Sequence, residues 1–270
     1  MNQQKRPNLI VGITGVCGGM GLELLKGFAN KNYFVLGIDN NKKKIKELEK
    51  EYHKEFKGYS CDLTQSNKYE LILQEIKDEF QTPDIWINNA GIAPIKTFME
   101  HKKQEYKDVM NINFHPIEQA TRFWLPEMEK NRAGKIVNIA SVAGLVSSPM
   151  LSSYCASKFA TVGFTKSLQK ELQIKQSNVN LILVCPGFID TKMINLGSHR
   201  GLPEELKHII ADANKSANKI IKGILKGSDY IDPTFNGKFF TTIDRYAPSL
   251  MKQIQVIITP EKWKEVLKKK

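Results

Sequence analysis

The sequence predicts an α/β protein, in which a single main domain forms a doubly wound parallel sheet with helices on both faces and a C-terminal helical extension follows. Two observations support this class. Short apolar runs recur along the chain, which is typical of parallel strands buried on both faces. Stretches with helical periodicity separate these runs, and right-handed crossovers through such helices place them on both sides of the sheet. Because no repeat or Pro/Ser-rich linker interrupts the alternation, we expect one domain.

The expected elements follow in chain order. The first strand, Leu9–Ile13, runs into a glycine-rich turn that opens a helix at about Gly19–Asn30. Asp39 ends the second strand, and Gly134 separates the fourth helix from the fifth strand. The later strands are expected at Tyr33–Ile38, Lys57–Cys61, Asp84–Ile87, Lys135–Ile139 and Val179–Val184. The later helices are expected at Lys42–Lys54, Ser66–Phe80, Lys103–Glu129 and Ser152–Ile174.

The last third of the chain departs from this pattern. Asp229–Pro233 is expected as a seventh strand, so the main domain is set at residues 1–232 and the extension at residues 233–270. Gly197 and Gly201 interrupt a stretch that we expect to form a mobile lid, at about residues 189–226. Within the extension, one helix face is expected to be apolar; its residues are Leu250, Met251, Ile254, Ile257 and Ile258.

The chain is strongly basic, with 40 Lys and Arg residues against 28 Asp and Glu residues and a net charge of +12. The longest single-sign runs are only Lys42–Lys44 and Lys268–Lys270. We therefore favour solvated lysine faces over a nucleic-acid-binding stripe and expect no nucleic-acid partner.

The sequence also argues against a secreted, a membrane-spanning or a metal-binding protein. The apolar run near the N-terminus is too short for a signal sequence or a membrane span. The four cysteines form no CxxC pair, so we expect reduced thiols and a cytoplasmic protein. The five histidines are scattered, and no metal site is expected.

The first candidate binding motif is the glycine-rich turn, Thr14-Gly15-Val16-Cys17-Gly18-Gly19-Met20-Gly21. It follows a strand and opens a helix, which is the context of a dinucleotide-binding turn. Glycines let the backbone approach a pyrophosphate, and the helix N-terminus offers free N–H groups.

The acidic residue that follows the second strand indicates which dinucleotide is bound. Asp39 lies 24 residues after Gly15, where a carboxylate can accept hydrogen bonds from ribose hydroxyls and repel a 2′-phosphate. We therefore predict NAD as the cofactor. NADP remains the alternative, because Lys42–Lys44 could reach a phosphate.

The second candidate motif carries acid–base chemistry. Tyr154 and Lys158 are four residues apart and share one face of a predicted helix, and Ser141 ends the fifth strand. A free tyrosine is a poor base at neutral pH, and a nearby ammonium is expected to lower its pKa. Ser141 could hydrogen-bond the same substrate oxygen as the phenol.

With these motifs in this order, residues 8–195 resemble the short-chain dehydrogenase/reductase family, which has a Rossmann-type fold. The resemblance implies a catalytic set consisting of Asn113, Ser141, Tyr154 and Lys158. It also implies a set of residues that bind the cofactor. These are Thr14, Gly15, Gly19, Met20, Gly21, Asp39, Asp62, Leu63, Asn89, Ala90, Gly91, Tyr154, Lys158, Pro186, Gly187, Ile189 and Thr191.

The activity implied by the resemblance is reversible hydride transfer between a nicotinamide and a carbonyl carbon. Tyr154 would exchange the proton with the substrate oxygen, Ser141 would orient that oxygen, and Lys158 would hold the nicotinamide ribose. Asn113 would hold a water in a proton relay. A non-catalytic dinucleotide-binding scaffold is the alternative, although all four catalytic positions are present.

The predicted substrate pocket is mainly apolar, which favours a lipophilic ketone or secondary alcohol. Its expected residues are Ser141, Met150, Tyr154, Phe188 and Met193. Core packing is an equally good interpretation of several apolar residues in this region.

The C-terminal tail resembles that of hydroxysteroid-dehydrogenase-like members and lacks the Asp-Gly-Gly close of many tetrameric members. We expect a homo-oligomer, with a dimer favoured. The tail is expected to pack on its own domain or on a dimer mate. A basic amphipathic segment resting on an anionic membrane is the less favoured alternative.

Overall fold

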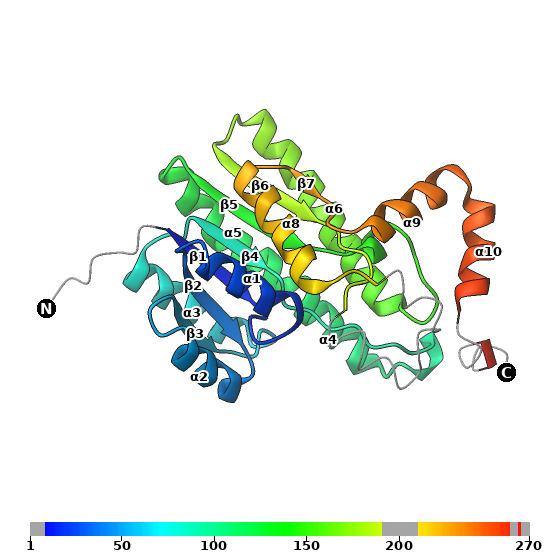
Figure 1. The fold of residues 1–270 in the computed structure, drawn as a ribbon, viewed down its shortest axis with the longest axis horizontal. Helices are drawn as coiled ribbons and strands as arrows, with labels where there is room; N and C mark the ends of the chain where they lie inside the picture. Colours follow the sequence, from blue (N-terminus) through cyan, green and yellow to red (C-terminus); the bar gives the residue numbers. More distant parts are fainter. Residues whose placement is uncertain (1–8, 191–209, 260–263, 266–270) are drawn as a thin grey trace, which may run out of the picture.

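The computed structural model describes residues 9–190, 210–259 and 264–265 of the chain. Its centre is a seven-stranded sheet in the order β3-β2-β1-β4-β5-β6-β7, and all neighbouring strands are parallel (Figure 1). The α/β doubly wound class is therefore confirmed. The strands are β1 Ile10–Thr14, β2 Phe34–Asp39, β3 Phe56–Ser60, β4 Ile85–Asn88, β5 Gly134–Ile139, β6 Val179–Val184 and β7 Tyr230–Ile231.

Helices cover both faces of the sheet. The α-helices are α1 Gly19–Ala29, α2 Lys42–Glu51, α3 Ser66–Phe80, α4 Lys103–Asn113, α5 His115–Lys130, α6 Ser152–Ile174, α8 Ala213–Lys226, α9 Phe235–Tyr246 and α10 Pro248–Ile258. The short 3-10 helices are η1 Phe98–Glu100 and η2 Val142–Gly144. One apolar core joins α1 and α8 to one face of the sheet, and a second joins α3, α5 and α6 to the other. Among the described residues, no helix combines the length and apolar character needed to cross a membrane.

The sequence predicts one long helix at Lys103–Glu129. The structure shows two helices, α4 and α5, so the prediction of a continuous helix was wrong at Phe114. Phe114 leaves the helical region, with φ −124° and ψ −53°. Pro116 follows in the first turn of α5. Because proline has no N–H and its ring clashes with the carbonyl four residues earlier, the helix ends before it and a new one begins.

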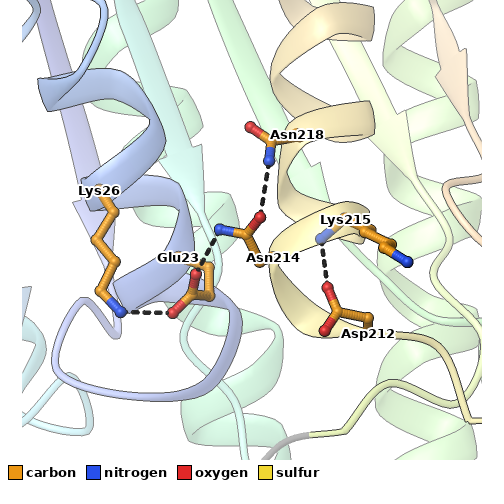
Figure 2. A network of polar contacts seen from close by, with 6 residues as sticks. All are labelled: Glu23, Lys26, Asp212, Asn214, Lys215 and Asn218. Atoms are coloured by element: carbon orange, nitrogen blue, oxygen red, sulfur yellow. Dashed lines mark hydrogen bonds and ion pairs between the residues drawn. The ribbon is translucent and has the colours of Figure 1, made fainter.

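Helix α8 packs directly on α1, and part of the predicted lid therefore forms a layer of the fold. A Cβ on Gly27 of α1 would lie 2.4 Å from the side chain of Ile221, which shows how close the two helices are. A polar bridge runs along the same contact, since Asn214 Nδ2 donates to Glu23 at 3.0 Å (Figure 2). Lys26 Nζ lies 2.8 Å from the other carboxylate oxygen of Glu23. Residues 191–209 of the predicted lid lie outside the described residues.

A buried chain of side-chain hydrogen bonds joins β4, β5 and α6. Trp86 Nε1 donates to Asn88 Oδ1 at 3.0 Å, and Asn88 Nδ2 donates to Asn138 Oδ1 at 2.8 Å. Asn138 Nδ2 then donates to Thr165 Oγ1 at 2.9 Å. Because each polar group needs its partner inside the core, this chain fixes the register of the two strands and the position of α6.

Candidate active site

A cavity of about 1010 Å³ opens along the carboxyl ends of the strands, where ligands of doubly wound sheets bind. It extends from the glycine-rich turn after β1 to the C-terminal helices α9 and α10. It is therefore large enough for both a dinucleotide and a substrate.

The glycine-rich turn has the shape of a phosphate-binding loop. Gly15 has a φ of +69°, and a Cβ there would lie 2.8 Å from the Cα of Ala90, so only glycine fits without strain. A Cβ on Gly21 would lie 2.0 Å from the carbonyl oxygen of Gly15. Gly18 precedes α1 and provides no side-chain cap, and a Cβ there would meet nothing within 4 Å. The first N–H groups of α1 are therefore left for a ligand, and the turn fits a pyrophosphate.

Asp39 holds this turn as well as lining the cavity. Its Oδ2 accepts from the backbone N–H of Cys17 at 2.9 Å, and its Oδ1 accepts from that of Asn41 at 2.9 Å. Burial and the neighbouring Asp39 carboxylate raise the pKa of the Cys17 thiol to about 12. Cys17 therefore stays protonated and does not act as a nucleophile.

Two more segments complete the dinucleotide end. Asp62, after β3, lines the cavity, and hydrogen bonds from Thr64 lower the pKa of its carboxyl. Asn89 binds back to the first strand: its backbone N–H donates to Thr14 Oγ1 at 3.0 Å, and its Nδ2 donates to Thr14 O at 3.0 Å. The N–H of Ala90 donates to the same hydroxyl at 3.1 Å. Thr14 is thus buried behind the cavity and positions the loop that lines it.

Ser141, Tyr154 and Lys158 lie together on the cavity wall. The Ser141 hydroxyl shares a hydrogen bond with Tyr154 and accepts from the N–H of Ala143 at 3.1 Å. Lys158 Nζ donates to Ile139 O at 2.8 Å and lies 5.7 Å from the centroid of the Tyr154 ring.

The pKa of the phenol is shifted in the direction opposite to the prediction. Burial raises the pKa of Tyr154 to about 12, and the hydrogen bond with Ser141 acts against this rise. Lys158 is itself buried, which lowers its pKa to about 8. Desolvation of the phenolate is the largest influence on the pKa of Tyr154, so the net shift is opposite in direction to the lowering expected from Lys158.

Asn113 does not line the cavity but lies directly behind it. It is fully buried, and its amide exchanges two hydrogen bonds with the backbone of Ile92, at 2.8 and 2.9 Å. Its Nδ2 also donates to Ser157 Oγ at 2.9 Å, and Ser157 Oγ donates to Tyr154 O at 2.7 Å. Asn113 therefore connects the loop after β4 to the helix that carries Tyr154.

The segment after β6 closes the cavity on the substrate side. The N–H of Gly187 donates to Thr234 Oγ1 at 2.8 Å, and a Cβ on Gly187 would lie 1.8 Å from Asn236 Oδ1. Asn236 Nδ2 donates to Phe188 O at 3.1 Å. The start of α9 is thus fixed against the Pro186–Phe188 segment.

Most of the predicted site residues line this one cavity. These are Gly15, Gly19, Met20, Asp39, Asp62, Leu63, Asn89, Ala90, Gly91, Ser141, Tyr154, Lys158, Pro186, Gly187, Phe188 and Ile189. Four predicted residues do not line it, namely Thr14, Gly21, Asn113 and Met150. Met150 is buried behind it while its neighbours Pro149 and Leu151 face it. Thr191 and Met193 lie outside the described residues.

Several lining residues are absent from the predicted site. Ile92–Ile95 follow the loop after β4, and Phe240, Met251, Gln255 and Thr259 come from the C-terminal extension. Met251 belongs to the apolar face predicted for the extension, but that pattern does not say which surface the face covers. Nothing in the sequence marks Gln255 as a residue of the site.

Comparisons with known proteins identify the family of this chain. The family model described as short chain dehydrogenase matches residues 9–199. The 3-oxoacyl-acyl-carrier-protein reductase FabG of Haemophilus influenzae is 32% identical over 212 residues, which cover 78% of this chain and 87% of that protein.

Solved structures show the same architecture. The short chain dehydrogenase/reductase of Burkholderia phymatum in complex with NAD superposes with a TM-score of 0.79 and 21% identity, covering 96% of this chain and 98% of that one. ElxO with NADP bound superposes with a TM-score of 0.72 and 25% identity, covering 83% and 97%. An identity of 21% establishes likeness of fold alone.

Proposed function

Since this chain belongs to the short-chain dehydrogenase family and is an NAD(P)-dependent oxidoreductase acting on CH–OH or carbonyl groups, we propose that it uses NAD(H) and a lipophilic substrate. The observation that carries the proposal is one cavity with two chemically distinct ends. Asp39 and the glycine-rich turn line one end, and Ser141, Tyr154 and Lys158 line the same space beside an apolar wall.

The dinucleotide end favours NAD. The turn at Gly15–Gly19 and the N-terminus of α1 would hold the pyrophosphate, and the Asp39 carboxylate would accept from the adenosine ribose and repel a 2′-phosphate. Of the three lysines that could favour NADP, Lys44 is paired with Glu47 at 3.1 Å. NADP remains the alternative cofactor. When bound, the nicotinamide supplies or accepts the hydride.

Side chains of the protein, and not the cofactor, would transfer the proton. In the carbonyl-reducing direction, Tyr154 donates its phenol proton to the substrate oxygen, and the Ser141 hydroxyl hydrogen-bonds that oxygen and stabilises its developing charge. The raised pKa of Tyr154 keeps the proton on the phenol at neutral pH, where it is available for donation to the substrate oxygen. Lys158 would hold the nicotinamide ribose, and Asn113 would position the relay behind the phenol.

The substrate end supports a neutral, lipophilic carbonyl compound. Val142, Val146, Phe188 and Phe240 supply apolar side chains there. A relative that acts as a 3-oxoacyl-acyl-carrier-protein reductase supports an acyl ketone as one candidate.

The experiment is reduction of a carbonyl panel by NADH and NADPH, including a 3-oxoacyl thioester and simple lipophilic ketones, followed at the nicotinamide absorbance. We expect turnover with NADH, a loss of about 10²–10⁴-fold in kcat for Tyr154→Phe, and unchanged NAD binding in that variant. Asp39→Ala should lose the preference for NADH. Full activity of Tyr154→Phe would refute the proton-transfer role, and NAD binding without any turnover would favour the scaffold alternative.

We also propose a cytoplasmic homodimer. Phe235 and Tyr246 are large side chains exposed on α9, and a dimer mate could cover them. Burial of Phe240 and Met251 favours packing of the extension on its own domain over a membrane-bound tail. Light scattering of the purified protein would measure the mass, and a monomer at micromolar concentration would contradict the dimer.

A further inference from the structure

Helix α10 presents one face to the cavity. Met251, Gln255 and Thr259 line it and are spaced four residues apart, which places them on one side of a helix. The adjacent Leu250 is 48% exposed, whereas Met251 is 4% exposed. The extension is therefore a wall of the reaction space, which Met251 lines and Leu250 does not.

This wall is tied to the loop that carries Ser141. Gln255 Nε2 donates to Ser147 O at 2.6 Å, six residues beyond Ser141. Met251 and Phe240 are buried in one apolar cluster with Val142, which directly follows Ser141. These contacts place α10 beside the catalytic hydroxyl in the folded protein.

The three residues of the α10 segment that line the cavity in the described structure are uncharged. Among the described residues that line the cavity, the charged ones are Asp39, Asp62 and Lys158. Asp39 is the last residue of β2 and Asp62 follows β3, at the opposite side of the molecule from α10 (Figure 1), and the Lys158 ammonium donates to Ile139 O. A carboxylate or phosphate placed at α10 would be desolvated without a partner, so this end suits an uncharged apolar group.

We propose that α10 selects the substrate, and that Met251 sets the length of the neutral apolar group attached to the reacting carbonyl. The proposal rests on the proposed function, because it assigns the apolar end of the same cavity. The substrate class is a ketone or secondary alcohol whose uncharged chain or ring system extends from Ser141 to Met251 and Phe240. Gln255 is a positioning residue that holds the wall through Ser147.

The test is a chain-length series of straight-chain 2-alkanones, of about four to twelve carbons, and their alcohols. Each added methylene that becomes buried should raise kcat/KM about three- to fourfold until the chain meets α10, after which the gain stops. In Met251→Phe the gain should stop at a shorter chain, with a loss of about tenfold for the longest substrates, mostly in KM. In Met251→Ala the gain in kcat/KM per added methylene should continue to a longer chain than in the wild type. Leu250→Phe and Leu250→Ala, which alter the outer side of the same helix, should reproduce the wild-type series.

Two further measurements keep the outcomes distinct. Calorimetric binding of the alcohols to the NADH complex, which has no hydride acceptor, gives the same chain-length series without turnover, so the inference is tested even for a substrate that reacts slowly. A terminal carboxylate on the longest ketone should remove the gain in affinity that its chain provides. Equal chain-length limits in the wild type and both Met251 variants would overturn the role of α10 and leave the proposed function intact. Failure of the proposed function would instead appear as unchanged turnover in Tyr154→Phe.

Discussion

Replacing Lys158 by Met is expected to make the fold more stable at neutral pH while removing turnover. Lys158 is 3% exposed, and burial lowers its pKa from the ordinary 10.5 to about 8. A shift of that size corresponds to about 3 kcal/mol of unfavourable free energy for the charged form in the folded state. Methionine keeps an unbranched apolar stem. The variant loses the hydrogen bond to Ile139 O, and this loss cancels about 1–2 kcal/mol of the stability gained by removing the buried charge. We therefore expect a net gain of about 1–2 kcal/mol in the free energy of unfolding at pH 7.

The pH dependence of this gain identifies its origin. Between about pH 8 and 10.5 the unfolded chain binds the Lys158 proton and the folded chain does not, so the stability of the wild type rises with pH in this window. Below about pH 8 both states hold the proton, and the penalty is fully present. The advantage of Lys158→Met should therefore be constant from about pH 6 to 7.5 and should shrink by about 2 kcal/mol by about pH 9.5.

Urea unfolding of the wild type and the variant across this pH range measures the difference. Lys170→Met is the matched control, because Lys170 lies on the same helix and its side chain is exposed. A difference between Lys158→Met and the wild type that stays constant to about pH 9.5 would refute a desolvation penalty at Lys158.

Two other predictions concern the framework of the site. Gly15→Ala places a Cβ 2.8 Å from the Cα of Ala90 at a φ of +69°. It should cost about 1–2 kcal/mol in urea unfolding and weaken NAD binding at least about tenfold by calorimetry; stability equal to that of the wild type would contradict this. Asn138→Ala removes the partners of Asn88 Nδ2 and Thr165 Oγ1, and should cost about 2–4 kcal/mol in the free energy of unfolding. A double-mutant cycle with Asn88→Ala should show coupling, and additive losses would argue against a shared buried chain.

The alternation of apolar runs and helical stretches was enough to predict the first six strands within one residue at either end, and the seventh within two. The extension was harder to predict. Helix α9 was not predicted from the sequence: its buried residues are Asn236, Gly237 and Phe240, of which only Phe240 is a large apolar residue, and the apolar Phe235 is 84% exposed. Pro116 marks the break before α5, but a proline in a first helical turn and one inside a long helix look alike in sequence.

The site was predictable where residue type and motif order determine the chemistry. Ser141, Tyr154 and Lys158 meet at one wall as the resemblance implied. The burial of the Tyr154 side chain could not be predicted from the motif, and this burial is the largest influence on the pKa of the phenol. Gln255 was missed because an amide between apolar positions has no distinguishing pattern until its partner, Ser147 O, is known.

The attachment of α9 and α10 also bears on how the protein moves. The central strands are buried along their whole length, whereas both C-terminal helices are exposed along one side and attach through Phe240, Met251 and a few hydrogen bonds. Segments with so little buried contact open locally at free energies well below that of global unfolding. Backbone amides of α10 should therefore exchange with solvent while those of β1 and β4 stay protected. Such an opening would admit a water-insoluble molecule to the reaction space without disturbing the bound dinucleotide.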